Sequence, residues 1–345
     1  MHPIQLTIPS HIEHLSQILA GFLMLREQGA SVEFRDVSRE ESHPLAALPV
    51  VLMEYRGLRV VYDLWDGYQD PAGIRRGLEC CDVYFKRSFS REKNLDLFPD
   101  MADKMHPLGL NHHLVYPGDP IQEPIWKALA KPLLGRTPDR YFRPRVFEGE
   151  PENGQTNILF QTRLWDPQDP SLTQEENRQR EHLNAERMEI IRTLRSRYGE
   201  RFYGGLNDTP LSRELSPELI IPARYTERRR YLRLVHQCGI CIGTVGLHDS
   251  IGWKTGEYVA AARAIVHDPL RYTLPGDFAE GKNYLEFQNA QQCIDQVARL
   301  VECPQQRRAM QEANRAYYQK YLRPDRLVQN TLDLLDQRLD FPAGK

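Results

Sequence analysis

The chain has 345 residues, of which 41% are hydrophobic and 27% are charged. That length suits about two globular domains, and the composition excludes disordered, collagen-like and disulfide-dense classes. Lys and Arg number 45 against 47 Asp and Glu, a formal net charge of −2. This balance argues against a dedicated nucleic-acid binder, which usually carries a large basic excess.

The start of the chain carries no sign of export or of a membrane span. The sequence MHPIQLTIPS has no cationic segment followed by an apolar segment and a cleavage site. The longest apolar run nearby, residues 18–25, is far shorter than the ~20 residues a spanning helix needs. We therefore expect a cytoplasmic protein without a transmembrane segment, although its composition is compatible with peripheral membrane contact.

The six cysteines are expected to be reduced thiols in that compartment. Cys238 and Cys241 have the spacing of a redox or zinc motif, but no second pair accompanies them. We interpret both as buried thiols, and we predict no metal site.

The first half of the chain alternates strand patterns with helix patterns. A capping box at Ser10 and Glu13 predicts the start of a helix that ends at Gly29, and a second helix is predicted over residues 73–81. Strands are predicted at residues 4–8, 31–37, 50–55, 58–64, 82–89 and 104–110. This alternation predicts a mostly parallel sheet covered by helices.

Prolines interrupt the pattern between residues 117 and 151, and a second alternation follows. Strands are predicted at residues 157–162, 201–204, 239–245 and 264–266, and helices at 185–198, 228–235, 253–263 and through most of 288–335. We predict an α/β fold with two Rossmann-like domains facing a cleft, residues 1–150 and 151–345. The last helix is a candidate to pack back on the N-terminal domain.

Residues 239–266 carry the strongest functional pattern, which predicts a strand, a glycine-rich turn, a helix and another strand. Asp249 or Ser250 is expected to cap the helix, so that Ser250, Lys254 and Glu257 share one helical face. The free N–H groups of a helix start attract phosphate.

Three residues of this segment could complete a ligand site. Gly252 lets a ligand approach the backbone, and Lys254 can neutralise an anion bound at the helix start. Glu257, one turn further, can accept hydrogen bonds from ribose hydroxyls. The segment therefore predicts a site for a diphosphate and a ribose.

Asp249 and Glu257 are separated by seven residues, and Gly252 stands three after the first acid. This pattern resembles the acidic pair of retaining GT-B glycosyltransferases, the sucrose-synthase-like group and its CgeB-like relatives. Residues 157–164, 257–266, 278–287 and 304–335 resemble other segments of that group. The resemblance implies the GT-B architecture and a metal-independent transfer, without a resident cofactor, of a sugar from a nucleotide-diphospho-sugar. The acceptor would be a hydroxyl of a glycan, a lipid-linked glycan or a protein, and the configuration would be retained.

The same resemblance implies a role for each matched residue. Glu257 would bind the ribose hydroxyls, and Asp249 would contact hydroxyls of the donor sugar. Arg163 would bind the diphosphate and stabilise the leaving group. The backbone around Ser250 and Gly252 would support the phosphates or the sugar.

Other readings of the sequence stay open. The stretch TIPSHIEHLSQILAGF resembles the first loop and helix of inverting GT-B enzymes, where His11 stands at the position of a general base. Asp63 and Asp66, at the end of the strand predicted over 58–64, are further candidates for acceptor binding or base work. A nucleotide-sugar epimerase or hydrolase and a non-catalytic nucleotide-binding partner of a glycosylation complex are the alternative functions.

Overall fold

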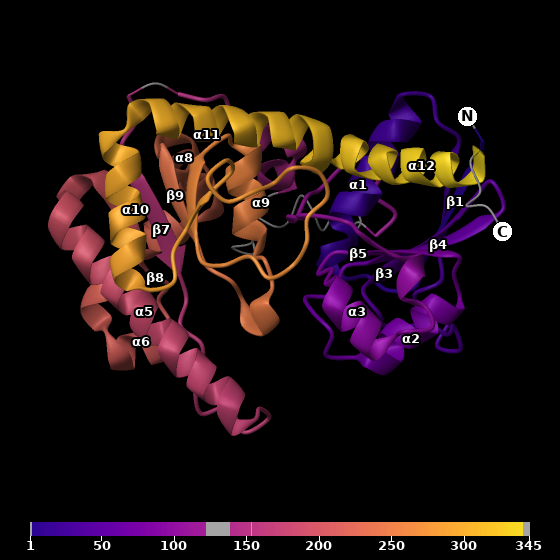
Figure 1. The fold of residues 1–345 in the computed structure, drawn as a ribbon, viewed down its shortest axis with the longest axis horizontal. Helices are drawn as coiled ribbons and strands as arrows, with labels where there is room; N and C mark the ends of the chain where they lie inside the picture. The colour runs from indigo at the N-terminus through magenta and orange to yellow at the C-terminus, as the bar shows by residue number, and fades with distance from the viewer. Residues whose placement is uncertain (1, 122–138, 153, 341–345) are drawn as a thin grey trace.

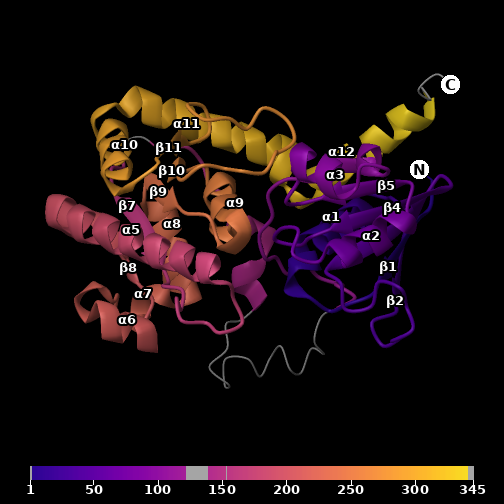
Figure 2. The same ribbon diagram turned by 60° about the horizontal axis from the view of Figure 1, so that its bottom comes forward.

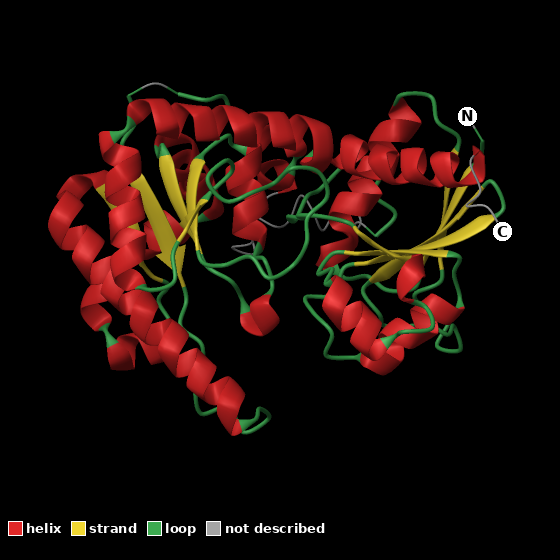
Figure 3. Ribbon diagram, viewed as in Figure 1, coloured by secondary structure: helices red, strands yellow, loops and turns green. Residues whose placement is uncertain are grey.

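Two β-sheets, each covered by helices, organise the computed structural model (Figures 1 and 3). It describes residues 2–121, 139–152 and 154–340. The predicted fold class, α/β with two Rossmann-like sheets, is confirmed by this layout. Of the helices in the described ranges, none has an apolar stretch long enough to cross a membrane.

The first sheet has the strand order β2-β1-β3-β4-β5-β6. Its strands are β1 (Ile4–Ile8), β2 (Val32–Asp36), β3 (Val50–Tyr55), β4 (Leu58–Asp63), β5 (Val83–Lys86) and β6 (Met105–Pro107). β3 runs antiparallel to β1 and β4, whereas the other neighbouring pairs are parallel. Arg56 and Gly57, with φ of 51° and 83°, form the tight β3–β4 turn, because paired positive φ values match the twist of a hairpin.

The helices of this domain are α1 (Ser16–Glu27), α2 (Pro71–Glu79) and α3 (Arg91–Leu97), with 3-10 turns η1 (Glu13–Leu15) and η2 (Ala102–Lys104). The predicted capping box at Ser10 is wrong. Buried Ser10 instead donates from Oγ to the Leu48 carbonyl at 2.6 Å, and α1 begins after η1 without a side-chain cap. The hydroxyl that the local pattern assigns to the helix cap is therefore bonded to the bend before β3.

The second sheet is entirely parallel, with the order β11-β10-β9-β7-β8. Its strands are β7 (Ile158–Thr162), β8 (Phe202–Leu206), β9 (Ile240–Gly243), β10 (Ala264–His267) and β11 (Leu285–Glu286). From β7 the chain continues to β8 on one side of that strand and then crosses to β9 on its other side. In such sheets a ligand binds at this switch point, beyond the carboxyl ends of the strands.

One helix of the second domain is much longer than predicted. α5 begins at Gln174, where Thr173 and Glu176 form a capping box, and not near residue 185. The other helices are α6 (Pro210–Leu215), α7 (Ala223–Thr226), α8 (Arg228–Gln237), α9 (Trp253–Ala260), α10 (Ala290–Glu302) and α11 (Pro304–Tyr317). Short turns are η3 (Asp139–Phe142), η4 (Pro144–Val146), η5 (Gly199–Arg201), η6 (Pro217–Leu219) and η7 (Leu247–Asp249).

The last helix, α12 (Pro324–Asp340), lies against the first sheet's helix α1 (Figure 2). A π-helical turn, η8 (Tyr318–Leu322), connects it to α11. Apolar side chains of α12 such as Leu327 and Leu332 share a core cluster with Phe22 of α1. A Cβ on Gly21 would lie 2.3 Å from the Pro324 carbonyl oxygen, so only glycine permits this approach.

Candidate functional site

Buried Arg187 of α5 joins the two loops at the switch point of the second sheet. Its Nη1 donates to the Arg163 carbonyl at 2.8 Å, after β7. Its Nη2 donates to Thr244 Oγ1 at 2.9 Å and to the Val245 carbonyl at 3.1 Å, after β9. Arg187 cannot be predicted as a site residue from the sequence, because a lone arginine in a helix carries no pattern that reveals which loops it reaches.

Lys254 and Arg163 lie at the same end of the sheet. Lys254 Nζ donates to the Gln161 carbonyl of β7, and burial lowers the pKa of Lys254 to about 8. Glu257 opposes this shift, whereas nearby arginines add to it. The exposed Arg163 guanidinium lies 3.9 Å from the Trp165 ring centre. An anion bound here would relieve the repulsion between these cations.

Glu257 is the buried acid of this cluster. Its Oε1 accepts from Arg228 Nη2 at 2.9 Å, and its Oε2 accepts from the Tyr231 hydroxyl at 2.8 Å. A carboxylate offers about four acceptor positions, so both oxygens keep capacity for a further hydrogen bond. Glu257 can therefore hold Arg228 and also accept from a ligand diol.

Gly252 is the N-cap of α9, and no side chain caps this helix. The predicted cap at Asp249 or Ser250 is therefore wrong: Asp249 belongs to η7, and Ser250 is extended. Lys254 and Glu257 remain on α9, but Ser250 lies outside it. A Cβ on Gly252 would meet no atom of the described residues within 4 Å, so there is room for a ligand beside the backbone at this position.

The loop between β9 and α9 holds two strained residues in succession. His248 and Asp249 both have φ of 60°, a conformation that costs about 1–3 kcal/mol for each non-glycine residue. The Tyr272 hydroxyl fixes the loop by donating to the His248 carbonyl at 2.8 Å. The Asp268 carboxylate accepts from the Val245 amide at 2.8 and 3.0 Å. Strain maintained by such contacts is typical of functional loops.

Arg87, at the end of β5, connects the two domains. Its side chain is 4% exposed and pairs with Asp66, and its Nη2 donates to the Ile251 carbonyl in the β9–α9 loop. The structure thus brings Asp66 close to the loop that carries Asp249, Ser250 and Gly252. The role of Arg87 cannot be predicted from the sequence, because its contacts depend on how the domains pack.

His14, and not His11, faces the second domain from the β1–α1 segment. The His14 ring lies 4.9 Å from the Trp253 ring, and burial lowers its pKa. His11 Nε2 instead contacts Asp36 Oδ2 at 2.8 Å and Ser38 Oγ at 3.1 Å. The structure therefore does not bring His11 together with the other candidate residues.

Asp63, Cys238 and Cys241 are buried. Asp63 accepts from Lys86 Nζ at 2.8 Å and from the Tyr84 hydroxyl at 2.8 Å, and the Asp63 and Lys86 side chains are fully buried. Cys238 and Cys241 are free, buried thiols whose pKa is raised by desolvation. In the described ranges, no group of three His, Cys, Asp or Glu residues is placed to hold a metal ion.

Comparison with known proteins finds a family match in the second half of the chain. Residues 178–333 match a family model described as glycosyl transferase-like. The predicted enzyme class, glycosyltransferase, is confirmed at the level of this domain. The match contains Arg187, Arg228, Asp249, Lys254 and Glu257. None of the curated proteins compared with the chain matches it.

Several solved structures are similar to this chain over most of its length. HepE of Anabaena in complex with UDP has 10% identity and a TM-score of 0.47, over 94% of this chain and 96% of HepE. Sucrose-phosphate synthase of Thermosynechococcus elongatus has 10% identity and a TM-score of 0.40, over 99% of this chain and 100% of the synthase.

Proposed function

We propose that the chain transfers a sugar from a nucleotide-diphospho-sugar to a hydroxyl of a glycan, a lipid-linked glycan or a protein. The observation that carries this proposal lies within the glycosyl transferase-like segment. An open helix start at Gly252, a buried Lys254 of lowered pKa and a buried Glu257 surround the switch point of one parallel sheet. This set suits a diphosphate attached to a ribose.

Each residue has a role in this proposal. The start of α9, Lys254 and Arg163 bind the diphosphate, and Glu257 accepts hydrogen bonds from the ribose. Asp249 contacts hydroxyls of the donor sugar, and the backbone at Ser250 and Gly252 supports the adjacent phosphate. As the nucleoside diphosphate departs, fixed positive groups stabilise its growing charge without a catalytic metal.

The proposed reaction breaks the bond between the anomeric carbon of the sugar and the phosphate oxygen. The electron pair stays on the leaving diphosphate, and the acceptor oxygen bonds to the anomeric carbon. We propose retention, in which the acceptor proton passes to the departing phosphate, because the spacing of Asp249 and Glu257 is the more specific motif. In an inverting enzyme, a base such as Asp66 or His14 would take that proton. The anomeric configuration of the product, read by NMR, decides between the two courses.

We also propose residues 1–150 as the acceptor-side domain and 151–345 as the donor-side domain, in a cytoplasmic protein. The grouping of strands β1–β6 and β7–β11 into separate sheets supports this division. Arg87 would then link the domains where donor and acceptor meet.

Thermal-shift measurements with UDP, GDP and ADP test the donor site. At least one nucleotide should raise the melting temperature of the wild-type chain, because a ligand that binds only the folded state stabilises it. Glu257→Ala should lose this effect, whereas Glu189→Ala, at an exposed position of α5, should keep it. If no nucleotide stabilises the wild type, the proposal fails. If Glu257→Ala responds normally, the ribose contact is wrong.

A further inference from the structure

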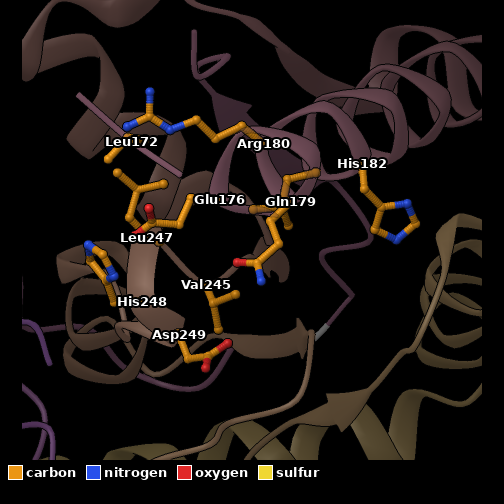
Figure 4. A pocket seen from close by; sticks show the side chains of 11 residues that line it. Leu172, Glu176, Gln179, Arg180, His182, Val245, Leu247, His248 and Asp249 are labelled. Carbon is orange, nitrogen blue, oxygen red and sulfur yellow. The ribbon is translucent and has the colours of Figure 1, made fainter. Parts of the chain in front are cut away.

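A pocket of about 190 Å³ lies between the first turns of α5 and the loop after β9 (Figure 4). One wall comes from α5 and the residues before it, and the other wall comes from residues 245–249. Arg163, Ser250, Gly252, Lys254 and Glu257 are not among its lining residues. Asp249 alone belongs both to the pocket and to the proposed donor site.

The α5 wall exists only because the helix begins at Gln174. The capping box at Thr173 fixes these first turns, with Glu176 accepting from the Thr173 amide and hydroxyl at 2.8 Å each. Arg180 is also occupied, since it donates to the Asp166 carbonyl at 2.6 Å and lies 3.2 Å from Asp169 Oδ2. Arg180, the lysine or arginine that the structure describes in the lining, is therefore paired through its Nη1 with an aspartate, so its charge is partly compensated before a ligand binds.

The remaining lining suits a neutral ligand rich in hydroxyls. Four apolar side chains, Leu172, Leu183, Val245 and Leu247, can pack against C–H groups. Gln179 and Asp249 are exposed, and within the described part of the chain neither side chain is hydrogen-bonded or ion-paired. Figure 4 shows Gln179 reaching from the helix and Asp249 from the loop toward Val245. Apolar walls with a few convergent polar groups are typical of ligand sites.

The strained conformation of His248 and Asp249 forms part of this wall. The contacts of Tyr272 and Asp268 hold the loop in that conformation. Asp249 is thus maintained at the pocket rim at a cost in backbone energy, without a protein partner among the described residues. An exposed carboxylate in this position is available to accept a hydrogen bond from a ligand hydroxyl.

We propose that this pocket binds one neutral sugar unit of the acceptor. The inference rests on the proposed function, because it places the acceptor next to the donor sugar at their shared residue, Asp249. The volume of about 190 Å³ is below the ~300–1,000 Å³ of sites for larger ligands, as expected for a single ring. Recognition of the acceptor would then involve the donor-side domain as well as the N-terminal domain.

Saturation-transfer NMR with methyl glycosides of glucose, galactose, mannose and N-acetylglucosamine tests the proposal. Spectra are recorded with and without a saturating nucleoside diphosphate. At least one glycoside should receive transfer from the wild type. Gln179→Ala should weaken its binding about fivefold, as expected for one lost hydrogen bond, and Leu183→Trp, which fills the pocket, should abolish it. Glu181→Ala, exposed on the same helix but outside the lining, is the matched control and should bind normally.

Nucleotide affinity, measured for each variant, separates this inference from the proposed function. It should be unchanged in all three variants, and melting curves confirm that each variant folds. Glycoside binding that survives Leu183→Trp overturns the inference, as does the absence of any glycoside signal from a wild type that binds nucleotide. Weaker nucleotide binding in both pocket variants would also overturn it, because the pocket would then belong to the donor. If no nucleotide binds, the proposed function fails irrespective of the glycoside result.

Discussion

Lys254→Met removes the buried cation of the candidate donor site, and its effect on stability depends on pH. Burial lowers the pKa of Lys254 from 10.5 to about 8, a difference of about 3 kcal/mol between the charged and neutral forms. Below pH 8 the lysine is charged in both states, so the folded protein carries this cost. Between pH 8 and 10.5 the unfolded chain binds more protons, and wild-type stability rises with pH from this group. Above pH 10.5 the lysine is neutral in both states, so this group no longer changes the stability as the pH rises.

At pH 7, Lys254→Met should therefore be as stable as the wild type, or more stable by about 1–3 kcal/mol, because an apolar side chain replaces a buried charge. This gain should shrink as the pH rises from 8 to 10.5. Urea unfolding at several pH values measures both quantities. Lys282→Met, at a side chain 49% exposed, should change little at any pH. A loss of stability at pH 7 that does not vary with pH would refute the reasoning.

Nucleotide affinity provides a second test of Lys254, and here the substitution should weaken binding although it does not lower stability. A bound diphosphate favours charged Lys254, so wild-type affinity should fall about tenfold for each pH unit above 8 until the pH reaches the raised pKa of Lys254 in the complex. Lys254→Met should lose about 10–100-fold in affinity at pH 7, the worth of a charge-assisted hydrogen bond, and its affinity should not fall above pH 8. Calorimetric titration with the nucleotide that binds best provides the test. A variant that keeps the wild-type pH slope would show that Lys254 does not contact the phosphates.

Three other substitutions test contacts inside the candidate site, inside the first sheet and between the domains. Glu257→Gln should lower the free energy of unfolding by about 3 kcal/mol in urea, because Arg228 loses its buried partner; a change below 1 kcal/mol would mean that water already shields the pair. Asp63→Asn should cost about 3–5 kcal/mol by leaving Lys86 buried and unpaired, and a second change of Lys86 to Met should recover much of that loss. Arg87→Met should accelerate amide exchange across residues 247–256, since the Ile251 carbonyl loses its donor; unchanged exchange there would show that the contact does not hold the loop.

The sequence predicts most strands because short runs rich in apolar and β-branched residues, bounded by turn residues, mark them. β1 and β3 match their predicted bounds, and the turn at Arg56 and Gly57 marks the hairpin. The first turns of α5 escape prediction, because residues 174–184 are largely polar and lack an apolar period. The capping box at Thr173 and Glu176 is the local signal that marks the true start.

Only part of the candidate site can be found from the sequence, because local spacing fixes only those neighbours that share one element. Lys254 and Glu257 are found because one helix carries both. Arg187 and Arg87 each reach loops from distant parts of the chain, so their roles depend on strand order and domain packing. His11 and His14 differ by three residues, yet the turn η1 directs only His14 toward the second domain.

The near-neutral chain can still offer a diphosphate a positive site, because its charge is distributed unevenly. Arg187 is held by loop carbonyls and Arg228 by Glu257, so their positions are fixed before any ligand arrives. Within the described residues, Lys254 donates to the Gln161 carbonyl, and burial, with the neighbouring arginines adding to it, lowers the pKa of Lys254. Lys254 therefore gains a counter-charge when an anion binds. Such a site would recognise phosphate through groups already in place, and its affinity would depend on the protonation of one lysine.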